Sequence, residues 1–323
     1  MKYTQIHKIF IKYFRAELSI PISKNVIVAT SGGQDSLALW KLLKDYQQYY
    51  DYNIHITYCN HKWRKDSIEN ANVLNYMSQY WGIYFHYYST CKSLRNEAEG
   101  RIWRYQKLIK LSIQTQPSEL LLAHTLTDKI ETFLKNFFLR YFINEFNSLL
   151  PIIYFLRNSL LLRPLITISR YKTFWLCQLS YLPIWSDYTN YFLKSKRNRI
   201  RFEFLPYIKT NFNSEIEIQF RNFLNLQKLQ SLYINSLVNN FLRKTLKYNR
   251  YKTILKVTLI QNLPLILQYI ILKQFIFYCF KISISVSLVK NILCRIYLDK
   301  LPYTIYYKKH SLEINKNYIY YRN

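Results

Sequence analysis

Apolar and polar positions follow two different rhythms along the first 140 residues. Short apolar runs of the strand type are separated by longer stretches in which apolar residues recur at helical spacing. The pattern predicts strands at 26–30, 54–58, 83–88 and 120–123, and helices at 37–43, 69–81, 101–113 and 128–140. This alternation predicts an α/β fold with a parallel, Rossmann-like sheet covered by helices on both faces.

The rest of the chain follows a different pattern. Residues 150–205 read as an irregular extension containing several prolines, and beyond about residue 210 the chain reads as helices to about 280, then as mixed short elements. We therefore expect a first domain over 1–210 and a mainly helical C-terminal region over 211–323. The most apolar stretch, 263–280, is interrupted by Gln268, Lys273 and Gln274 and barely long enough to span a bilayer, so we expect a buried helix there.

Polar residues directly follow three of the predicted strands. Ser31, His61 and His124 stand at these positions. Because ligands of parallel α/β sheets bind at the carboxyl ends of the strands, three chain segments are expected to converge on one binding edge. For both histidines, lining a pocket and packing remain open alternatives.

The charge balance points to a polyanionic partner. The chain has 46 Lys and Arg against 18 Asp and Glu, a formal net charge of +28, while half of its residues are hydrophobic. That apolar fraction excludes a disordered basic tail, and a folded domain with this charge favours nucleic acid first and an anionic membrane surface second. The five cysteines form no CxxC pair, which argues against a disulfide framework and a cysteine-based metal site.

The sharpest local motif is the loop that follows the first predicted strand, Ser31-Gly32-Gly33-Gln34-Asp35-Ser36. A strand, a glycine-containing loop and a helix start direct backbone N–H groups toward an anion, and the serines add hydroxyl donors. Asp35 would repel phosphate unless a divalent cation such as Mg2+ bridges the two. The alternative is that Asp35 only compensates the helix dipole.

Here the sequence resembles the PP-loop ATPases, whose signature is SGGxDS after a first strand. Further blocks narrow the resemblance to the tRNA(Ile)-lysidine synthase family. They match that family's DHGLR, NEAxAR…RY, AHHxDDQxET, RPL, DxSN and RNRIR segments, in the right order, at 60–64, 96–105, 123–132, 163–165, 187–190 and 197–201.

The resemblance implies an ATP-dependent ligase. Members of the family activate the C2 carbonyl oxygen of the wobble cytidine, in an isoleucine tRNA bearing a CAU anticodon, as an adenylate. The amine of L-lysine then displaces AMP and gives lysidine, which changes codon reading from AUG to AUA. The expected substrates and partners are therefore ATP with Mg2+, L-lysine and this tRNA, and not a membrane.

The resemblance also assigns roles. The loop from Ser31 to Ser36 would bind ATP, with Asp35 holding Mg2+, and Arg101 would help to stabilise the leaving pyrophosphate. Asp128 and Glu131, three apart on a predicted helix, share a face and would bind the cationic lysine, although helix-dipole compensation is an equal alternative without the family context. The basic run with Arg197, Arg199 and Arg201 would bind tRNA phosphates or form a solvated helix face.

Several positions depart from the family pattern. Asn60, Lys62 and Trp63 stand at places usually held by Asp, Gly and Leu, and Thr125, Thr127 and Lys129 replace further family residues. Because Asp35, Arg101, Asp128 and Glu131 are retained, we expect an active enzyme. The alternatives are another PP-loop tRNA enzyme, a thiolase, which the lack of CxxC disfavours, and an inactive basic RNA-binding protein.

The composition also suggests an origin. Ile, Lys, Asn, Tyr and Phe are abundant and glycine is scarce, as expected for an AT-rich genome. Together with the bacterial type of the family and an N-terminus without a recognisable targeting segment, this predicts a plastid-encoded protein of the chloroplast stroma. The alternative is the cytoplasm of a reduced bacterium.

Overall fold

The computed structural model describes residues 4–16, 24–91, 95–115, 118–139, 149–156, 159–186, 195–249, 252–280, 284–298, 300–307 and 310–322. The chain divides into two compact units, residues 1–224 and 225–323, and each is described by itself. The sequence placed a boundary at 210. The DxSN-like segment 187–190 lies outside the described residues.

The first unit is built on a six-stranded sheet with the order β3-β2-β1-β4-β6-β5. All pairings are parallel except that of β5 with β6. The strands are β1 (Asn25–Thr30), β2 (Asn53–Asn60), β3 (Tyr84–Ser89), β4 (Ser118–Leu122), β5 (Ile152–Leu156) and β6 (Ser159–Leu162). The first four confirm the expected strands, and the fold class is confirmed.

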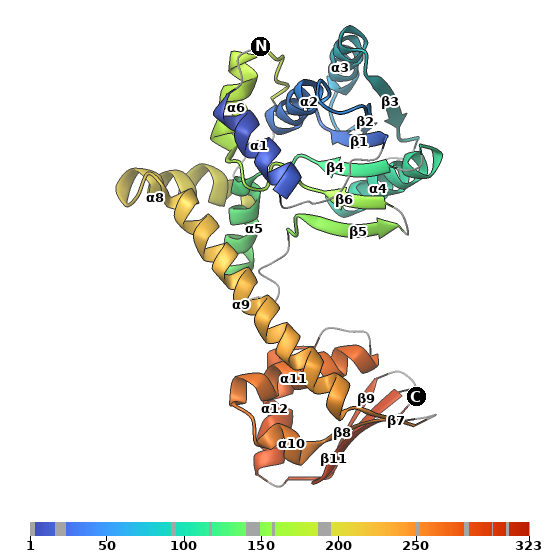
Figure 1. Cartoon of the computed structure of the whole chain (residues 1–323), viewed down its shortest axis with the longest axis vertical. Helices are drawn as coiled ribbons and strands as arrows, with labels where there is room; N and C mark the ends of the chain where they lie inside the picture. Colours follow the sequence, from blue (N-terminus) through green and yellow to red (C-terminus); the bar gives the residue numbers. More distant parts are fainter. Residues whose placement is uncertain are drawn as a thin grey trace. The chain divides into compact units, whose positions relative to one another are not determined.

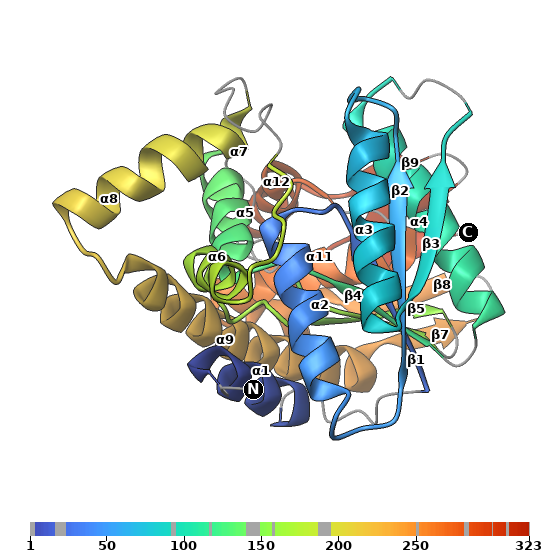
Figure 2. The same ribbon diagram turned by 90° about the horizontal axis from the view of Figure 1, so that it is seen from above.

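Helices cover both faces of this sheet (Figure 1). They are α1 (Gln5–Ala16), α2 (Gln34–Tyr46), α3 (Ser67–Trp81), α4 (Glu97–Gln114), α5 (Leu126–Phe138) and α6 (Arg170–Leu179). A view from above shows α2 and α3 side by side (Figure 2). Val26 and Val28 of β1 face the core formed with α1, α2, α3 and α6, whereas Ile27 packs with Leu108 and Leu111 of α4. The buried central strand thus contributes side chains to both layers.

Two segments of the first unit were read differently from sequence. The helix α1 was not predicted, because its basic residues hid the apolar face of Ile6, Phe10, Tyr13 and Phe14, which is buried. The region 150–205, expected to be irregular, contains β5, β6, α6 and the start of a bent helical segment. That segment comprises α7 (Lys196–Arg199), the π-helical turn η3 (Ile200–Phe204) and α8 (Leu205–Asn211).

The helix α9 (Ile216–Thr245) begins in the first unit and leads into the second. The second unit contains α10 (Val257–Gln261), α11 (Leu265–Phe280) and α12 (Val286–Tyr297). It also has a five-stranded antiparallel sheet, which the sequence did not indicate, with the order β7-β8-β11-β10-β9. These strands are β7 (Lys247–Asn249), β8 (Lys252–Lys256), β9 (Tyr303–Tyr307), β10 (His310–Ile314) and β11 (Tyr318–Arg322).

The expected helix over 263–280 is α11. It buries Ile271, Leu272, Phe275 and Ile276 in the core of the second unit. Within the described residues, no helix combines the length and the apolar character that a membrane crossing requires.

Candidate active site

The loop after β1 has the geometry that its two glycines suggest. Gly32 has a φ of +81°, and a Cβ at this position would lie 2.3 Å from Oδ1 of Asn70 on α3. Asn70 donates to the carbonyl of Ser31 (3.0 Å), and the backbone N–H of Trp185 donates to the carbonyl of Gly32 (3.0 Å). Only glycine combines this conformation with so close a neighbour. The loop is therefore held from two sides at the point where α2 begins.

The hydroxyl groups of both loop serines form hydrogen bonds within the loop. The hydroxyl of Ser31 accepts from the N–H of Gly33 (3.3 Å), and the hydroxyl of Ser36 donates to the carbonyl of Gly33 (2.8 Å). The amide of Gln34 donates to the carbonyl of Arg170 (2.9 Å) and thereby ties the loop to α6. The amides at the start of α2 thus form a prearranged site of the kind that binds anions.

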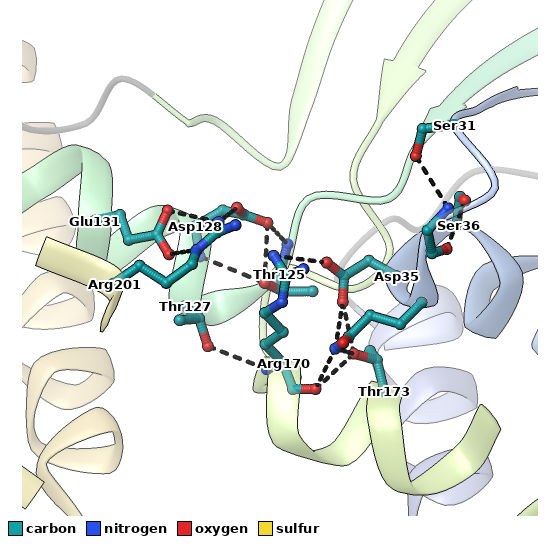
Figure 3. Close-up of polar contacts among 12 residues, drawn as sticks. Ser31, Asp35, Ser36, Thr125, Thr127, Asp128, Glu131, Arg170, Thr173 and Arg201 are labelled. Carbon is teal, nitrogen blue, oxygen red and sulfur yellow. Dashed lines mark hydrogen bonds and ion pairs between the residues drawn. The ribbon is translucent and has the colours of Figure 1, made fainter. Parts of the chain in front are cut away.

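Asp35 sits in the first turn of α2 and faces α6. Its Oδ1 accepts from the hydroxyl of Thr173 (2.6 Å), and its Oδ2 lies 3.4 Å from NH1 of Arg170 (Figure 3). Burial raises the pKa of Asp35, the positive charge of Arg170 lowers it less, and the negative charge of Asp128 raises it further. A cation beside this carboxylate would offset both the cost of burying its charge and the repulsion from Asp128.

This arrangement fits Mg2+ bound together with phosphates. In the described part of the chain there is no cluster of three His, Cys, Asp or Glu side chains that could hold a metal by itself. Mg2+ commonly uses one or two carboxylates and takes the remaining ligands from substrate phosphates and water. Asp35 could supply such a carboxylate, and a bound cation would stabilise its charge, which burial disfavours.

Asp128 and Glu131 lie on the first turns of α5, as the sequence predicted. Thr125 and Asp128 form a capping box: Oδ2 of Asp128 accepts from the backbone N–H (2.9 Å) and the hydroxyl (3.0 Å) of Thr125. Glu131 is one turn further along, and its side chain is fully buried. Helix-dipole compensation and function are thus compatible at Asp128, because capping uses only one of its two oxygens.

Two arginines neutralise this carboxylate pair. Arg197 contacts Oδ1 of Asp128 (2.6 Å) and Oε2 of Glu131 (2.8 Å). Arg201 contacts Oδ1 of Asp128 (3.0 Å) and both oxygens of Glu131 (2.5 and 2.8 Å). Burial raises the pKa of Asp128, but Arg197, the Thr125 N–H and Arg201 together outweigh it, so the net shift is downward.

The three arginines of the basic run are therefore not equivalent. Arg197 and Arg201 turn toward the buried carboxylates, whereas Arg199 pairs with Glu203 (3.0 Å) and its side chain is 66% exposed. Arg197 and Arg199 belong to α7, whereas Arg201 belongs to the π-helical turn η3. Of the residues expected to bind RNA phosphates, only Arg199 points away from the carboxylate pair in this structure.

His124, after β4, is neutral near pH 7. Burial lowers the pKa of His124 to about 4, and its Nδ1 accepts from Nε of Arg163 (3.2 Å), a buried residue of the RPL-like block. His61, after β2, packs against aromatic rings, and burial and the charge of Arg104 lower its pKa as well. Both shifts disfavour the protonated form, so neither histidine is suited to binding phosphate as a cation.

The structure does not bring every expected residue together. Ser31, Asp35 and Ser36 of the loop gather with Asp128 and Glu131 at the carboxyl edge of the sheet (Figure 3). Arg101 instead lies exposed on α4, with its guanidinium carbon 5.7 Å from the ring centre of Tyr105. Its contact with pyrophosphate remains a prediction.

Sequence reasoning missed the residues that support these groups. Thr173 and Arg170 hold Asp35 from α6, a region without a recognisable signal. Thr127 is one of the departures from the family pattern. Its hydroxyl donates to Oε1 of Glu217 (3.1 Å) and accepts from the N–H of Arg170 (3.0 Å), so it links α5, α6 and the start of α9.

Comparison with known proteins gives one consistent family. The PP-loop domain family matches residues 4–208. The chain is 39% identical to the chloroplastic tRNA(Ile)-lysidine synthase of Cyanidium caldarium, over 93% of this chain and 96% of that protein. It is 32% identical to the chloroplastic tRNA(Ile)-lysidine synthase of Gracilaria tenuistipitata var. liui, over 99% of both chains.

Among solved structures, the U34-tRNA thiolase NcsA from Methanococcus maripaludis shares the fold. The TM-score is 0.57 at 16% identity, over 69% of this chain and 78% of that one. This likeness concerns the fold alone, whereas the two lysidine synthase relatives match this chain over nearly its whole length. The chain belongs to the tRNA(Ile)-lysidine synthase family.

Proposed function

We propose that this protein ligates L-lysine to C2 of the wobble cytidine in an isoleucine tRNA with a CAU anticodon, using ATP. The C2 oxygen of the cytosine attacks the α-phosphorus of ATP, and pyrophosphate leaves. An amine of lysine then bonds to C2 as AMP leaves with the former C2 oxygen. The observation that carries this proposal is the buried pair of carboxylates, Asp128 and Glu131, beside the glycine loop and Asp35.

The glycine loop is suited to the phosphate end of ATP. The amides at the start of α2 and the hydroxyl of Ser31 are placed to stabilise phosphate charge. Ser36 would join them only by giving up its bond to the carbonyl of Gly33, and Arg101 only by turning toward the site from its exposed position on α4. Asp35 would hold Mg2+ against the phosphates, where the ion would offset the charge that develops on pyrophosphate. Thr173 and Arg170 fix the orientation of Asp35.

The carboxylate pair is suited to an ammonium group. Asp128 and Glu131 already bind two cationic side chains, and Arg197 is the more exposed of these, at 42% against 13% for Arg201. We infer that the ammonium of lysine takes the place of Arg197 while Arg201 stays. Once the amine is close to C2, one of these carboxylates accepts the proton that the amine must lose.

This exchange also explains how Arg197 can serve the tRNA. An arginine displaced from Asp128 and Glu131 is free to pair with a phosphate of the bound RNA, next to Arg199. The C-terminal region would add further phosphate contacts, and the net charge of +28 predicts strongly salt-dependent tRNA binding. The full-length relatives are named chloroplastic, and we propose the chloroplast stroma as the location of this protein.

The test is incorporation of radiolabelled L-lysine into a transcript of the isoleucine tRNA with the CAU anticodon. We expect ATP-dependent labelling of this tRNA and none of an elongator methionine tRNA. Asp35→Ala and Glu131→Ala should abolish the label. Salt-sensitive tRNA binding without any label in the wild type would overturn the ligase and favour an RNA-binding role.

A further inference from the structure

Trp63 lies directly against a glycine of a neighbouring helix. It follows β2, and a Cβ built on Gly100, in the first turn of α4, would lie 2.7 Å from Cη2 and 3.1 Å from Cζ2 of its indole ring. A contact of 2.7 Å with a rigid ring is too short for any real Cβ. The position of Trp63 therefore depends on the absence of a side chain at residue 100.

The residues at 63 and 100 both depart from the family pattern, and the two departures depend on each other. The DHGLR segment has Leu where this chain has Trp63, and the NEAxAR segment has Ala where it has Gly100. With Ala at 100, the indole would have to move, and with Leu at 63, the space above Gly100 would be less filled. The large residue after β2 and the small residue in the first turn of α4 fit each other at the binding edge.

Other aromatic rings support the indole from behind. The rings of His61 and Trp63 are stacked, with centroids 4.9 Å apart and an interplanar angle of 26°. Trp103 meets His61 edge-on, with centroids 5.1 Å apart. Burial and the charge of Arg104 lower the pKa of His61, which favours the neutral form of the ring that stacks on the indole. Trp63 itself is 52% exposed, so a large part of this supported ring is accessible to solvent.

Basic side chains accompany these rings on α4. Gly100, Trp103, Arg104 and Lys107 follow the spacing that places residues on one helical face. Nζ of Lys107 lies 5.8 Å from the ring centre of Trp103. The charge of Arg104 adds to burial in lowering the pKa of both His61 and His124, so Arg104 lies near the loops that follow β2 and β4.

We propose that Trp63, seated on Gly100, is a stacking platform for an unpaired nucleobase, with Arg104 and Lys107 placed for the attached phosphate. The inference rests on the proposed function, which brings two such bases to this edge: the adenine of ATP and the unpaired bases of the anticodon loop. A partly exposed indole beside cationic groups is an arrangement that binds unpaired bases by stacking.

The proposal is tested by binding, with the full-length protein and two probes. The first probe is a non-hydrolysable ATP analogue with Mg2+, and the second is the anticodon stem-loop of the isoleucine tRNA. We expect Trp63→Leu to raise the Kd for one of them by about 5- to 150-fold, the range of one lost stacking contact. Trp63→Phe should retain most of the affinity, and the affected probe identifies the source of the base.

A double-mutant cycle tests the role of Gly100. Gly100→Ala should weaken binding in the wild-type background, because the new methyl group displaces the indole, but should add little in a Trp63→Leu background. The matched control is Trp175→Leu, which removes a tryptophan of similar exposure, 44%, from α6. This control should leave both Kd values unchanged.

The outcomes separate this proposal from the proposed function. If Trp63→Leu leaves both Kd values within twofold of the wild type, the platform is wrong, whether or not the wild type forms lysidine. If the wild type forms no lysidine but base binding still depends on Trp63, the platform stands and the ligase activity falls.

Discussion

Arg201 grips the buried carboxylate of Glu131 with two parallel contacts. Its Nε lies 2.5 Å from Oε1, and its NH2 lies 2.8 Å from Oε2. This side-on geometry matches the planar guanidinium to the planar carboxylate, which a lysine could not reproduce. Because Glu131 is fully buried, the pairing decides whether its charge is tolerated in the folded protein.

Loss of Arg201 should therefore strongly destabilise the fold. We expect Arg201→Ala to lower the free energy of unfolding by about 3 kcal/mol or more, the cost of leaving a buried charge without its partner. Arg197→Ala should cost less, about 1 kcal/mol, because Arg201 still faces both carboxylates. Urea unfolding followed by circular dichroism measures both values.

Arg199→Ala is the matched control for these variants. Its partner is the exposed Glu203, so the change should stay within about 0.5 kcal/mol. Equal destabilisation by all three alanine variants would contradict the distinction between the clamped and the outward-facing arginines.

Arg197→Ala also tests the exchange of arginine for lysine. If the ammonium of lysine displaces Arg197, removing this side chain should lower the KM for lysine several-fold, while weaker tRNA contacts raise the KM for tRNA. Steady-state kinetics with each substrate varied in turn gives both constants. A raised KM for lysine would show that Arg197 assists lysine binding instead.

Thr173 should control the ionisation of Asp35. Its hydroxyl donates to Oδ1 over 2.6 Å and helps to lower the pKa of Asp35 against the dominant effect of burial. In Thr173→Val that help is lost, so the pKa rises and the acid limb of the pH–rate profile should move to higher pH. We expect about a tenfold loss of kcat/KM for ATP near neutral pH. Thr173→Ser keeps the hydroxyl and should keep the wild-type profile, and an unmoved limb in Thr173→Val would refute the idea.

Lys62 keeps a conformation suited to the glycine of the family pattern. Its φ is +58°, and its N–H donates to Oδ1 of Asn60 (2.8 Å). A left-handed conformation costs a side-chain-bearing residue about 1–2 kcal/mol, which the greater chain entropy of glycine offsets in part. Lys62→Gly should therefore stabilise the protein by up to about 1 kcal/mol. Thermal unfolding checks this. A lower melting temperature would mean that contacts of the Lys62 side chain stabilise the protein by more than the left-handed conformation costs.

His55 should make the fold sensitive to acid. Burial and, to a smaller extent, the charge of His86, 3.0 Å away between ring nitrogens, lower the pKa of His55 to about 4. The unfolded chain binds this proton near pH 6.5, so the contribution of His55 to stability is complete above pH 6.5 and is lost as the pH falls toward 4. Urea unfolding at a series of pH values should show a shallower decline for His55→Gln, and an identical slope would count against this assignment.

The sequence predicts most of what depends on local pattern. The strands and helices from β1 to α5 follow from apolar spacing, and Gly82 ends α3 in the left-handed conformation expected of a C-terminal glycine. Asp128 and Glu131 could be placed on one face because their separation fixes it. These inferences use neighbours within about one helical turn.

What the sequence hides are partners brought together from distant segments. Asp35 and Thr173 are 138 residues apart, and no spacing rule relates them. The basic run 197–201 reads as a solvated or phosphate-binding face, yet two of its arginines turn toward α5 because buried carboxylates require cations. In the antiparallel sheet of the second unit, the pairing of β8 with β11, more than sixty residues later, is equally hidden, whereas its other three pairings join consecutive strands.

Because both carboxylate oxygens of Asp128 accept hydrogen bonds, this position restricts which codon changes the gene can tolerate. One base substitution converts an aspartate codon to an asparagine codon, and at residue 60 the chain has Asn where the family pattern has Asp. There the amide suffices: its oxygen accepts from Lys62, and its nitrogen donates to the hydroxyl of Tyr87 (3.0 Å). At Asp128 both oxygens accept, one from Thr125 and the other from two arginines. An amide nitrogen would face donors there, so mutational drift toward AT-rich codons is tolerated at residue 60 and barred at residue 128.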